Sequence, residues 1–352
     1  MAEVELLLAC RGSGPEHGLA RARRGGAGWV IELLAEQAQL SALARHPLLP
    51  VVYGVAGQQE GRILGWRVAQ RPTLLFDESS GGAQPCHLAV APDGRLLVAV
   101  NYDSAVITAW PLRTDGGLAG APVLRQLVGD GPDPDRQAQA HPHQVVFGPG
   151  YVIVVDLGAD LIRLFAADAQ LPPLGEVPTP PGSGPRHLVV LADGRVAVAA
   201  ELSAEILLGR LDPQDPDWAR HPSGHPSGHP CGHPTEHPGH PGERDVRTYP
   251  SEIVRHPSLP LVYLANRGRD TIATFAIGEA GPTLLAEIPA GVAWTQHLLV
   301  CADELLVAGE RSDQLAVFAL RDGLPSTGPN AVPGPVPCPA PCWITLDPTT
   351  SL

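Results

Sequence analysis

The sequence predicts an all-β fold, a seven-bladed β-propeller whose blades are four-stranded antiparallel sheets. Short runs of Val, Leu, Ile and Ala are interrupted about every 8–12 residues by Gly, Pro, Asp or Asn, which is the pattern of strands and turns. Helical periodicity is scarce. A repeat of about 45 residues also runs along the whole chain, and that period is typical of propeller blades.

The repeat is clearest in three segments that begin with proline. They read PCHLAVAPDGRLLVAVNYDSAVITAW from Pro85, PRHLVVLADGRVAVAAELSAEILL from Pro185 and PSEIVRHPSLPLVYLANRGRDTIATF from Pro250. Each contains an apolar strand, a turn rich in Pro, Asp or Gly, a second apolar strand, a polar tip and a third strand. A two-sheet sandwich array is the rival interpretation, but it would not require so regular a period.

Aligning the turns places one residue of each repeat at a shared position, which we call the anchor. Successive anchors are separated by 45, 57, 43, 65, 45 and 46 residues. The last repeat has only one strand, and EVELLLACRG, near the start of the sequence, can complete its blade and close the ring. Because a closed ring is one cooperative unit, residues 1–352 are expected to form a single domain. The seven anchors are Ser41, Cys86, His143, Arg186, Ser251, Gln296 and Cys342.

Residues 221–242 form a low-complexity tract rich in histidine and proline, HPSGHPSGHPCGHPTEHPGHPG. The tract lies in the anchor interval of 65 residues, and removing its 22 residues leaves an ordinary interval of 43. Its frequent prolines are incompatible with a helix or a sheet ladder, so the imidazoles should not share a fixed ligand geometry. We therefore expect a disordered insertion between strands, whose metal binding would be only that of histidine-rich tracts in general.

Polar residues replace the ordinary ones in three consecutive blades. In an antiparallel hairpin the start of the first strand lies beside the end of the second, so both positions face one end of the ring. Such residues could bind a small anionic or carbonyl substrate, or they could only tie blades together, with Arg186 and Glu201 as a plain ion pair. The residues expected at this end of the ring are His143, Asp156, Arg186, Glu201, Ser251, Glu252, Asn266 and Arg267.

A long loop, GDGPDPDRQAQAHPH, accounts for the anchor interval of 57 residues. We expect it to cover the site and to contribute Arg136 and His141. Three further histidines each follow an anchor, and they are expected to point away from the channel axis and to form structural hydrogen bonds. These are His87, His187 and His297.

The composition limits the partners of the chain. A formal charge of −13 argues against general binding to nucleic acid or to an anionic membrane. All 24 basic residues are arginine, which excludes Schiff-base and P-loop lysine chemistry. No GxSxG nucleophile elbow occurs. Six cysteines without paired spacing favour a reducing compartment, so a cytoplasmic location is expected.

Four segments together carry a resemblance to a known family. They are GPDPDRQAQAHPHQVVFGPG, GSGPRHLVVLADGRVAVAAE, SEIVRHPSLPLVYLANRGRDTIATF and PCPAPCW. They resemble the 6-phosphogluconolactonase propeller family, which also includes fungal carboxymuconate-lactonising enzymes. The chain departs from the family at Gln296, where arginine is common, and in LARARRGGAG of the first blade. The resemblance implies a lactonase with active-site residues His143, Arg186, Glu201 and Arg267.

The expected reaction is hydrolysis of a sugar lactone similar to 6-phosphogluconolactone, in carbohydrate metabolism. Either Glu201 or His143 would activate water, while Arg186 and Arg267 would stabilise the oxyanion or hold a phosphate. No metal or other cofactor is expected, and the protein is predicted to be a monomer or a weak homo-oligomer. Further residues predicted to bind the substrate are His141, Asp156, Arg136, Asn266 and Glu252.

Two other functions remain open from the sequence. A propeller can serve as a non-catalytic scaffold that binds another protein across one face. A metal-dependent sugar lactonase would need a cage of carboxylates and amides, which Asp156, Glu201 and Asn266 could partly supply.

Overall fold

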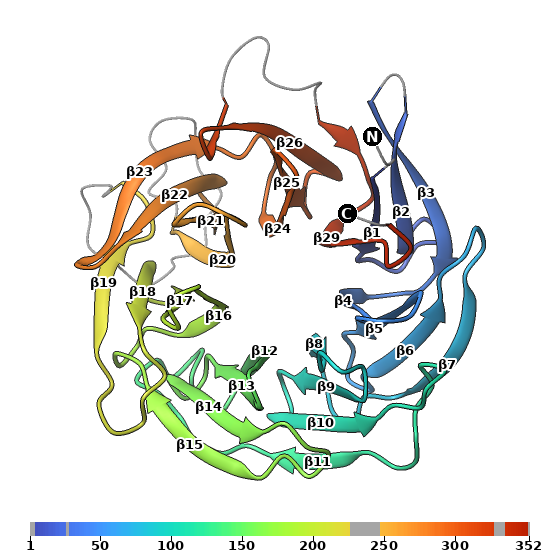
Figure 1. Ribbon diagram of the computed structural model, residues 1–352, viewed down its shortest axis with the longest axis horizontal. Coiled ribbons are helices and arrows are strands. Elements are labelled where there is room, and N and C mark those ends of the chain that lie inside the picture. Colours follow the sequence, from blue (N-terminus) through green and yellow to red (C-terminus); the bar gives the residue numbers. More distant parts are fainter. Residues whose placement is uncertain (1–3, 26–27, 226–246, 327–334, 351–352) are drawn as a thin grey trace.

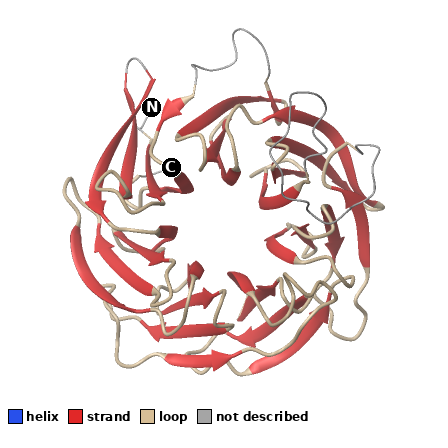
Figure 2. Cartoon of the chain, turned by 180° about the vertical axis from the view of Figure 1, so that it is seen from behind, coloured by secondary structure: helices blue, strands red, loops and turns tan. Residues whose placement is uncertain are grey.

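The computed structural model is a ring of β-sheets around a central channel (Figure 1). It describes residues 4–25, 28–225, 247–326 and 335–350. Seven sheets follow one another around the ring, and the described residues contain no α-helix (Figure 2). The described ranges therefore also contain no helix of the length and apolar character needed to cross a bilayer. The predicted seven-bladed β-propeller is confirmed.

Each blade is one antiparallel sheet whose first-named strand lies nearest the channel (Figure 1). Blade 1 contains β29 (Pro341–Leu346), β1 (Glu5–Cys10), β2 (Gly18–Gly25) and β3 (Gly28–Glu36). Blade 2 contains β4 (Leu40–Arg45), β5 (Val51–Ala56), β6 (Arg62–Arg67) and β7 (Thr73–Ser79). Blade 3 contains β8 (Pro85–Val90), β9 (Leu96–Asn101), β10 (Val106–Pro111) and β11 (Val123–Gln126).

The remaining blades continue around the ring. Blade 4 contains β12 (Pro142–Gly148), β13 (Tyr151–Asp156), β14 (Leu161–Ala166) and β15 (Pro173–Pro178). Blade 5 contains β16 (Pro185–Val190), β17 (Val196–Ala200), β18 (Glu205–Gly209) and β19 (Trp218–Pro222). Blade 6 contains β20 (Tyr249–Arg255), β21 (Leu261–Arg267), β22 (Thr271–Gly278) and β23 (Gly281–Pro289). Blade 7 contains β24 (Thr295–Cys301), β25 (Glu304–Gly309), β26 (Gln314–Arg321) and two short strands paired with β26, β27 (Leu324–Pro325) and β28 (Val336–Pro337).

The hydrophobic core lies between neighbouring blades. The second strand of a blade packs against a neighbouring blade on each face, so β5 (VVYGVA) and β9 (LLVAVN) are buried at every position. This is why these strands are continuous apolar runs instead of alternating patterns. The outer strand β11 (VLRQ) has no fully buried residue and alternates between partly buried and exposed positions, as expected for a rim strand.

The two ends of the described chain meet in blade 1. Strand β1 pairs antiparallel with β29, with Leu8 opposite Ile344 and Leu7 opposite Thr345. This pairing joins the first strand of the sequence to the last and removes the free edges that both would otherwise present. Closure of the ring by these two strands is as the sequence predicts.

Every anchor lies within a register shift of the first strand of its blade. In blade 2, for example, Leu40 pairs with Ala56 and Ala42 with Val55, which leaves Ser41 out of the ladder. The same shift lies between Pro85 and His87 and recurs in the other blades. Such a bulge bends the strand and redirects the side chain of the extra residue, and six of the seven anchors line a cavity in the channel.

The predicted insertion between strands does not begin at residue 221, because the first two residues of the histidine and proline tract belong to a strand. His221 and Pro222 belong to β19 and pair with Ile206 and Glu205. The predicted exclusion of proline from the ladder is therefore wrong at Pro222, which lies at the end of an outermost strand where a missing N–H is tolerated. The tract does connect β19 to β20, as expected, and residues 226–242 lie outside the described residues.

Candidate active site

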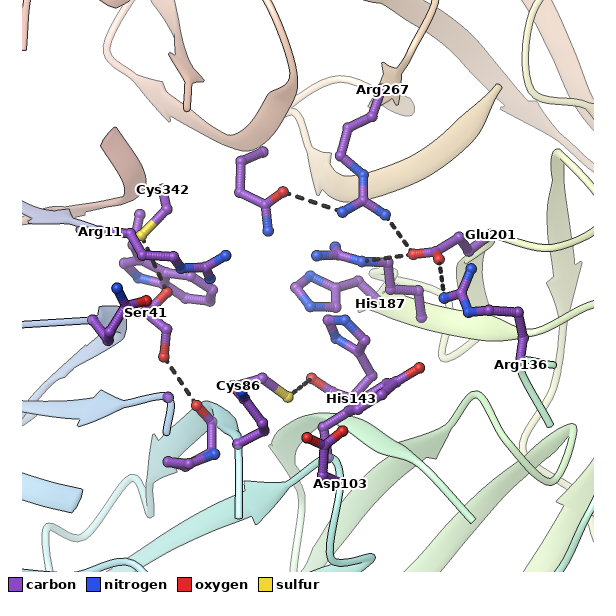
Figure 3. Close-up of a pocket in the computed structure, with 18 residues that line it drawn as sticks. Arg11, Ser41, Cys86, Asp103, Arg136, His143, His187, Glu201, Arg267 and Cys342 are labelled. Atoms are coloured by element: carbon purple, nitrogen blue, oxygen red, sulfur yellow. Dashed lines mark hydrogen bonds and ion pairs between the residues drawn. The ribbon is translucent and has the colours of Figure 1, made fainter. Parts of the chain in front are cut away.

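A cavity of about 420 Å³ occupies one end of the channel (Figure 3). All seven blades contribute to its lining, mainly through anchors and through the residues that directly follow the second strands. The predicted site residues that line it are Arg136, His143, Arg186, Glu201 and Arg267, and the anchor Gln296 lines it as well. The structure therefore brings together the four residues that the resemblance implies.

Glu201 lies among three guanidinium groups. Its Oε1 accepts a hydrogen bond from Arg136 Nη2 at 2.7 Å, and its Oε2 accepts one from Arg267 Nη2 at 2.5 Å. Arg186 Nε lies 3.1 Å from the same Oε2, without the alignment of a hydrogen bond. Burial alone raises the pKa of Glu201, but the charges of Arg267, Arg186 and Arg136 outweigh it and lower the pKa to about 2. Glu201 is therefore a stable carboxylate that holds the arginines in place.

Arg186 is the least satisfied cation in the cavity. Its residue is 2% exposed, and neither Nε nor Nη1 forms a hydrogen bond with the described residues. Burial, and then the charge of Arg267, lower its pKa to about 9, against the opposing effect of Glu201 and Glu252. A buried guanidinium with free N–H groups is suited to bind an anion that enters the cavity.

Arg267 is held in a fixed position at the wall of the cavity. Gln296 Oε1 accepts a hydrogen bond from Arg267 Nη1 at 3.2 Å, and the indole of Trp294 lies 5.2 Å from the guanidinium carbon. Gln296, where the family commonly has arginine, thus orients a cation instead of adding another. The fork of Arg267 is preorganised before substrate arrives.

His143 lines the cavity, next to the ring of His187 at a centroid distance of 5.1 Å (Figure 3). Burial, followed by the charges of Arg186 and His187, lowers the pKa of His143 well below its usual range. The imidazole is therefore neutral near pH 7 and can accept a proton. Its Nδ1 forms no hydrogen bond with the described residues.

Four residues predicted to bind substrate lie outside the cavity lining, namely Asp156, Asn266, His141 and Glu252. Asp156 accepts a hydrogen bond from Arg163 Nε at 2.9 Å within blade 4, and Asn266 donates one to the Ser223 carbonyl at 2.9 Å. His141 stacks on Tyr102 at 4.3 Å. Asp156 stabilises the interior of blade 4, Asn266 links blade 6 to the segment that follows β19 of blade 5, and the loop residue that does reach the cavity is Arg136.

The misplacement of Asp156 and Asn266 has a simple cause in the alternation of strand side chains. Asn266 pairs with Pro250 in the ladder, whereas Glu201 follows Ala200, which pairs with Pro185. Glu201 is thus equivalent to Arg267 and not to Asn266. A one-residue error in alignment moves a side chain to the other face of a strand.

Glu252, Trp343 and the three histidines that follow anchors form a layer at the floor of the cavity, which we call the floor layer, and His187 and Trp343 of this layer line the cavity. His187 contacts the rings of His87 at 5.3 Å and of Trp343 at 6.4 Å, and His297 lies 4.1 Å from Trp343. The histidines therefore converge on the channel axis, and the prediction that they point away from it is wrong. Glu252 binds His187 and does not line the cavity. The floor layer consists of His87, His187, Glu252, His297 and Trp343.

Sequence reasoning missed Arg11 and Tyr102, which both line the cavity. Arg11 follows Cys10, the last residue of β1, just as Arg267 ends β21 one residue beyond Asn266. Arg11 Nη1 donates a hydrogen bond to Glu310 Oε1 at 3.1 Å, on the far side of the cavity from Glu201 (Figure 3). Arg11 and Tyr102 each directly follow the second strand of their blade, so comparing this position among the repeats would have identified them.

The donors proposed for a metal cage do not meet. Asp156 and Asn266 lie within their blades, and Glu201 is occupied by arginines. Over the described ranges, no three His, Cys, Asp or Glu side chains are arranged to hold a metal ion. These residues do not fit the cage of a metal-dependent sugar lactonase.

The fold and the cavity define a class: a seven-bladed propeller with a cavity at one end of its channel that is lined by arginines and carboxylates. The chain matches the family model "Lactonase, 7-bladed beta-propeller" over residues 15–344 and belongs to that family.

Individual relatives agree with this assignment. The chain is 28% identical to a 6-phosphogluconolactonase of Bacillus subtilis over 211 residues, which are 59% of this chain and 56% of that protein. It is also 28% identical over 283 residues to a protein of Arthroderma benhamiae named "Probable 6-phosphogluconolactonase", covering 70% and 64% of the two chains. The alignments thus span less than two thirds of these relatives. The structure of a periplasmic gluconolactonase from Pseudomonas aeruginosa superposes with a TM-score of 0.81 and 22% identity, over 98% of this chain and 99% of that one, which is a likeness of fold.

Proposed function

We propose that the protein hydrolyses a sugar lactone that carries an anionic group, with 6-phosphogluconolactone as the leading candidate. The observation that carries the proposal is Arg186, a buried guanidinium with unused N–H groups in the wall of the cavity. Family membership and the names of two relatives support the reaction class.

The charges around Glu201 favour an anionic substrate. Arg136, Arg186 and Arg267 face one carboxylate, so the cluster has positive charge to spare. In a cavity of low dielectric this surplus attracts a phosphate, a carboxylate or a developing oxyanion. One of Arg186 and Arg267 would stabilise the oxyanion, and the other would hold the anionic group.

The proposed proton acceptor is His143. Of the two candidates left open by the sequence, Glu201 is a weak base because its pKa is about 2. His143 is neutral and lines the cavity. In the proposed reaction water attacks the lactone carbonyl, its proton passes to His143, and the alkoxide released by ring opening takes that proton back.

The experiment follows acid release from 6-phosphogluconolactone and from unphosphorylated gluconolactone, above the spontaneous rate, with the wild type and His143→Gln. We expect catalysis with the wild type, a preference for the phosphorylated lactone, and a loss of about a hundredfold or more in the variant. No acceleration of either lactone would contradict the proposal and favour the non-catalytic scaffold.

A further inference from the structure

The floor layer contains a buried hydrogen-bonded pair that the proposed reaction does not yet use. His187 Nδ1 lies 2.9 Å from Glu252 Oε2, and the two residues are 2% and 5% exposed. His297 Nε2 lies 3.4 Å from the same oxygen, on another blade. Because a carboxylate only accepts, its contact fixes the proton of His187 on Nδ1 and leaves Nε2 as an acceptor.

The pair lies between the cavity and the interior of the channel. The His187 ring lines the cavity and contacts His143 edge-on, with an interplanar angle of 68°. Its Nε2 is buried and forms no hydrogen bond with the described residues. Glu252 lies beneath, so a change at this carboxylate can reach His143 through the His187 ring.

The link from Glu252 through His187 to His143 matters because a positive charge forms on His143 during the proposed reaction. When His143 takes a proton from water, it becomes a cation next to Arg186 and Arg267, which both disfavour its charged form. Asp103 and Glu201 are the carboxylates that line the cavity, and three arginines already neutralise Glu201. Glu252 is also a buried carboxyl group: burial raises its pKa, the charges of His297 and Arg186 oppose this rise, and its ionised form favours the charged form of Arg186.

We propose that Glu252, through its hydrogen bond to His187, is a positioning residue for the proton acceptor: it fixes the His187 ring against His143 and offsets the positive charge that forms there. This inference rests on the proposed lactone hydrolysis. Bond making and breaking are unchanged: the water oxygen bonds to the carbonyl carbon, the ring C–O bond breaks, and His143 carries the proton between them.

A packing role alone would not require these contacts. His87 belongs to the same layer, is buried to 6% exposure and contacts the rings of His187 and Trp343, but it contacts no carboxylate. His87 therefore provides a matched control for a large buried histidine without the proposed role.

The test compares the pH profiles of kcat for the wild type, Glu252→Gln and His187→Gln, with 6-phosphogluconolactone as substrate. Gln at position 252 keeps the size and the hydrogen-bond acceptor but removes the charge. Loss of the anion disfavours the protonated forms of His143 and Arg186 and so lowers the pKa of each. The acidic limb, which reports His143, and the basic limb, which reports Arg186, should therefore both move to lower pH. We also expect kcat to fall by about tenfold or more, less than the loss of a proton acceptor itself.

His87→Gln should leave both limbs in place and change kcat by less than about threefold. Should Glu252→Gln fail to fold, Glu252→Asp, which retains the charge but shortens the reach to His187, should lower kcat while the basic limb stays in place. A fall in activity that is equal at all pH values in Glu252→Gln or His187→Gln would show a structural role and overturn the inference. If the wild type has no lactonase activity, the proposed function fails instead, so the two failures are distinct.

Discussion

Two groups of anchors occupy equivalent bulges in different blades, and their side chains have different roles. In blades 2 and 6 the anchor is serine: Ser41 Oγ donates to the Pro85 carbonyl at 3.0 Å, and Ser251 Oγ donates to the Thr295 carbonyl at 2.6 Å. Each therefore ties its blade to the next one. In blades 4 and 5 the anchors are His143 and Arg186, which line the cavity; Ser41 lines it too, but its hydroxyl group is used in the contact to the next blade. The bulge occurs in every blade, and the chemistry of its side chain determines whether the anchor links two blades or leaves polar groups free in the cavity.

The difference has a structural cost. The serine anchors have partners for their hydroxyl groups, whereas His143 Nδ1 and Arg186 Nη1 are buried without a hydrogen bond among the described residues. Buried polar groups without partners destabilise a fold by about 1–3 kcal/mol each. Blades 4 and 5 thus concentrate polar groups that a bound substrate could satisfy, which is typical of functional sites.

The largest effect is expected from Arg186→Ser, which gives blade 5 the anchor of blades 2 and 6. Serine is already accommodated in this bulge, and Glu201 keeps its bonds to Arg136 and Arg267, so the fold should persist. Lactonase activity should fall by about a hundredfold or more, the scale for loss of an oxyanion donor. A thermal melt tests whether the fold persists, and a turnover assay tests the loss of activity. Turnover near that of the wild type would show that Arg186 has only a structural role.

Glu201→Gln should mainly affect stability and its pH dependence. Its pKa falls from 4.5 to about 2 in the folded protein, so the cluster stabilises the fold above pH 4.5 and this stabilisation is lost as pH falls toward 2. Removing the carboxylate leaves three arginines facing one another and should cost about 3 kcal/mol near pH 7.

Denaturant titrations of Glu201→Gln and wild type at several pH values measure this effect. The difference in unfolding free energy should shrink as the pH drops below 4.5, because the wild-type carboxylate then takes up a proton on unfolding. A constant difference at all pH values would mean that Glu201 acts by packing and not by charge.

The fold was predictable because it is repeated, and the site was predictable only in part because each site residue occurs once. Seven copies of the same strand pattern identify the blades even where one copy is weak. A single residue, by contrast, is placed wrongly by an error of one position, as happened for Asn266, which is adjacent to the correctly placed Arg267. Contacts between blades, such as that of His187 with Glu252, join residues 65 positions apart, and no local pattern encodes them.

Ser251→Ala tests the other side of the comparison. The variant removes the donor to the Ala265 and Thr295 carbonyls and should lower the unfolding free energy by about 1–2 kcal/mol. Ser251 does not line the cavity, so kcat should stay within about twofold of wild type. A large loss of turnover with unchanged stability would contradict the division between ties and site residues.

The smallest effect is expected from deletion of residues 226–242, which join the blade of Arg186 to the blade of Arg267. The preceding segment has contacts of its own, because Asn266 Nδ2 donates to the Ser223 carbonyl at 2.9 Å and the His225 N–H donates to Glu287 at 2.6 Å. Deletion from 226 preserves both contacts, so melting temperature and turnover should match wild type.

A deletion of 221–242 is the matched control. It also removes the last two residues of β19, His221 and Pro222, and with them their pairing with β18 and the Ser223 contact to Asn266. Because Asn266 directly precedes Arg267, this longer deletion should lower both the melting temperature and the turnover. Equal behaviour of the two deletions would mean that the end of β19 contributes nothing to the position of Arg267, whose orientation would then depend on Glu201 and Gln296 alone.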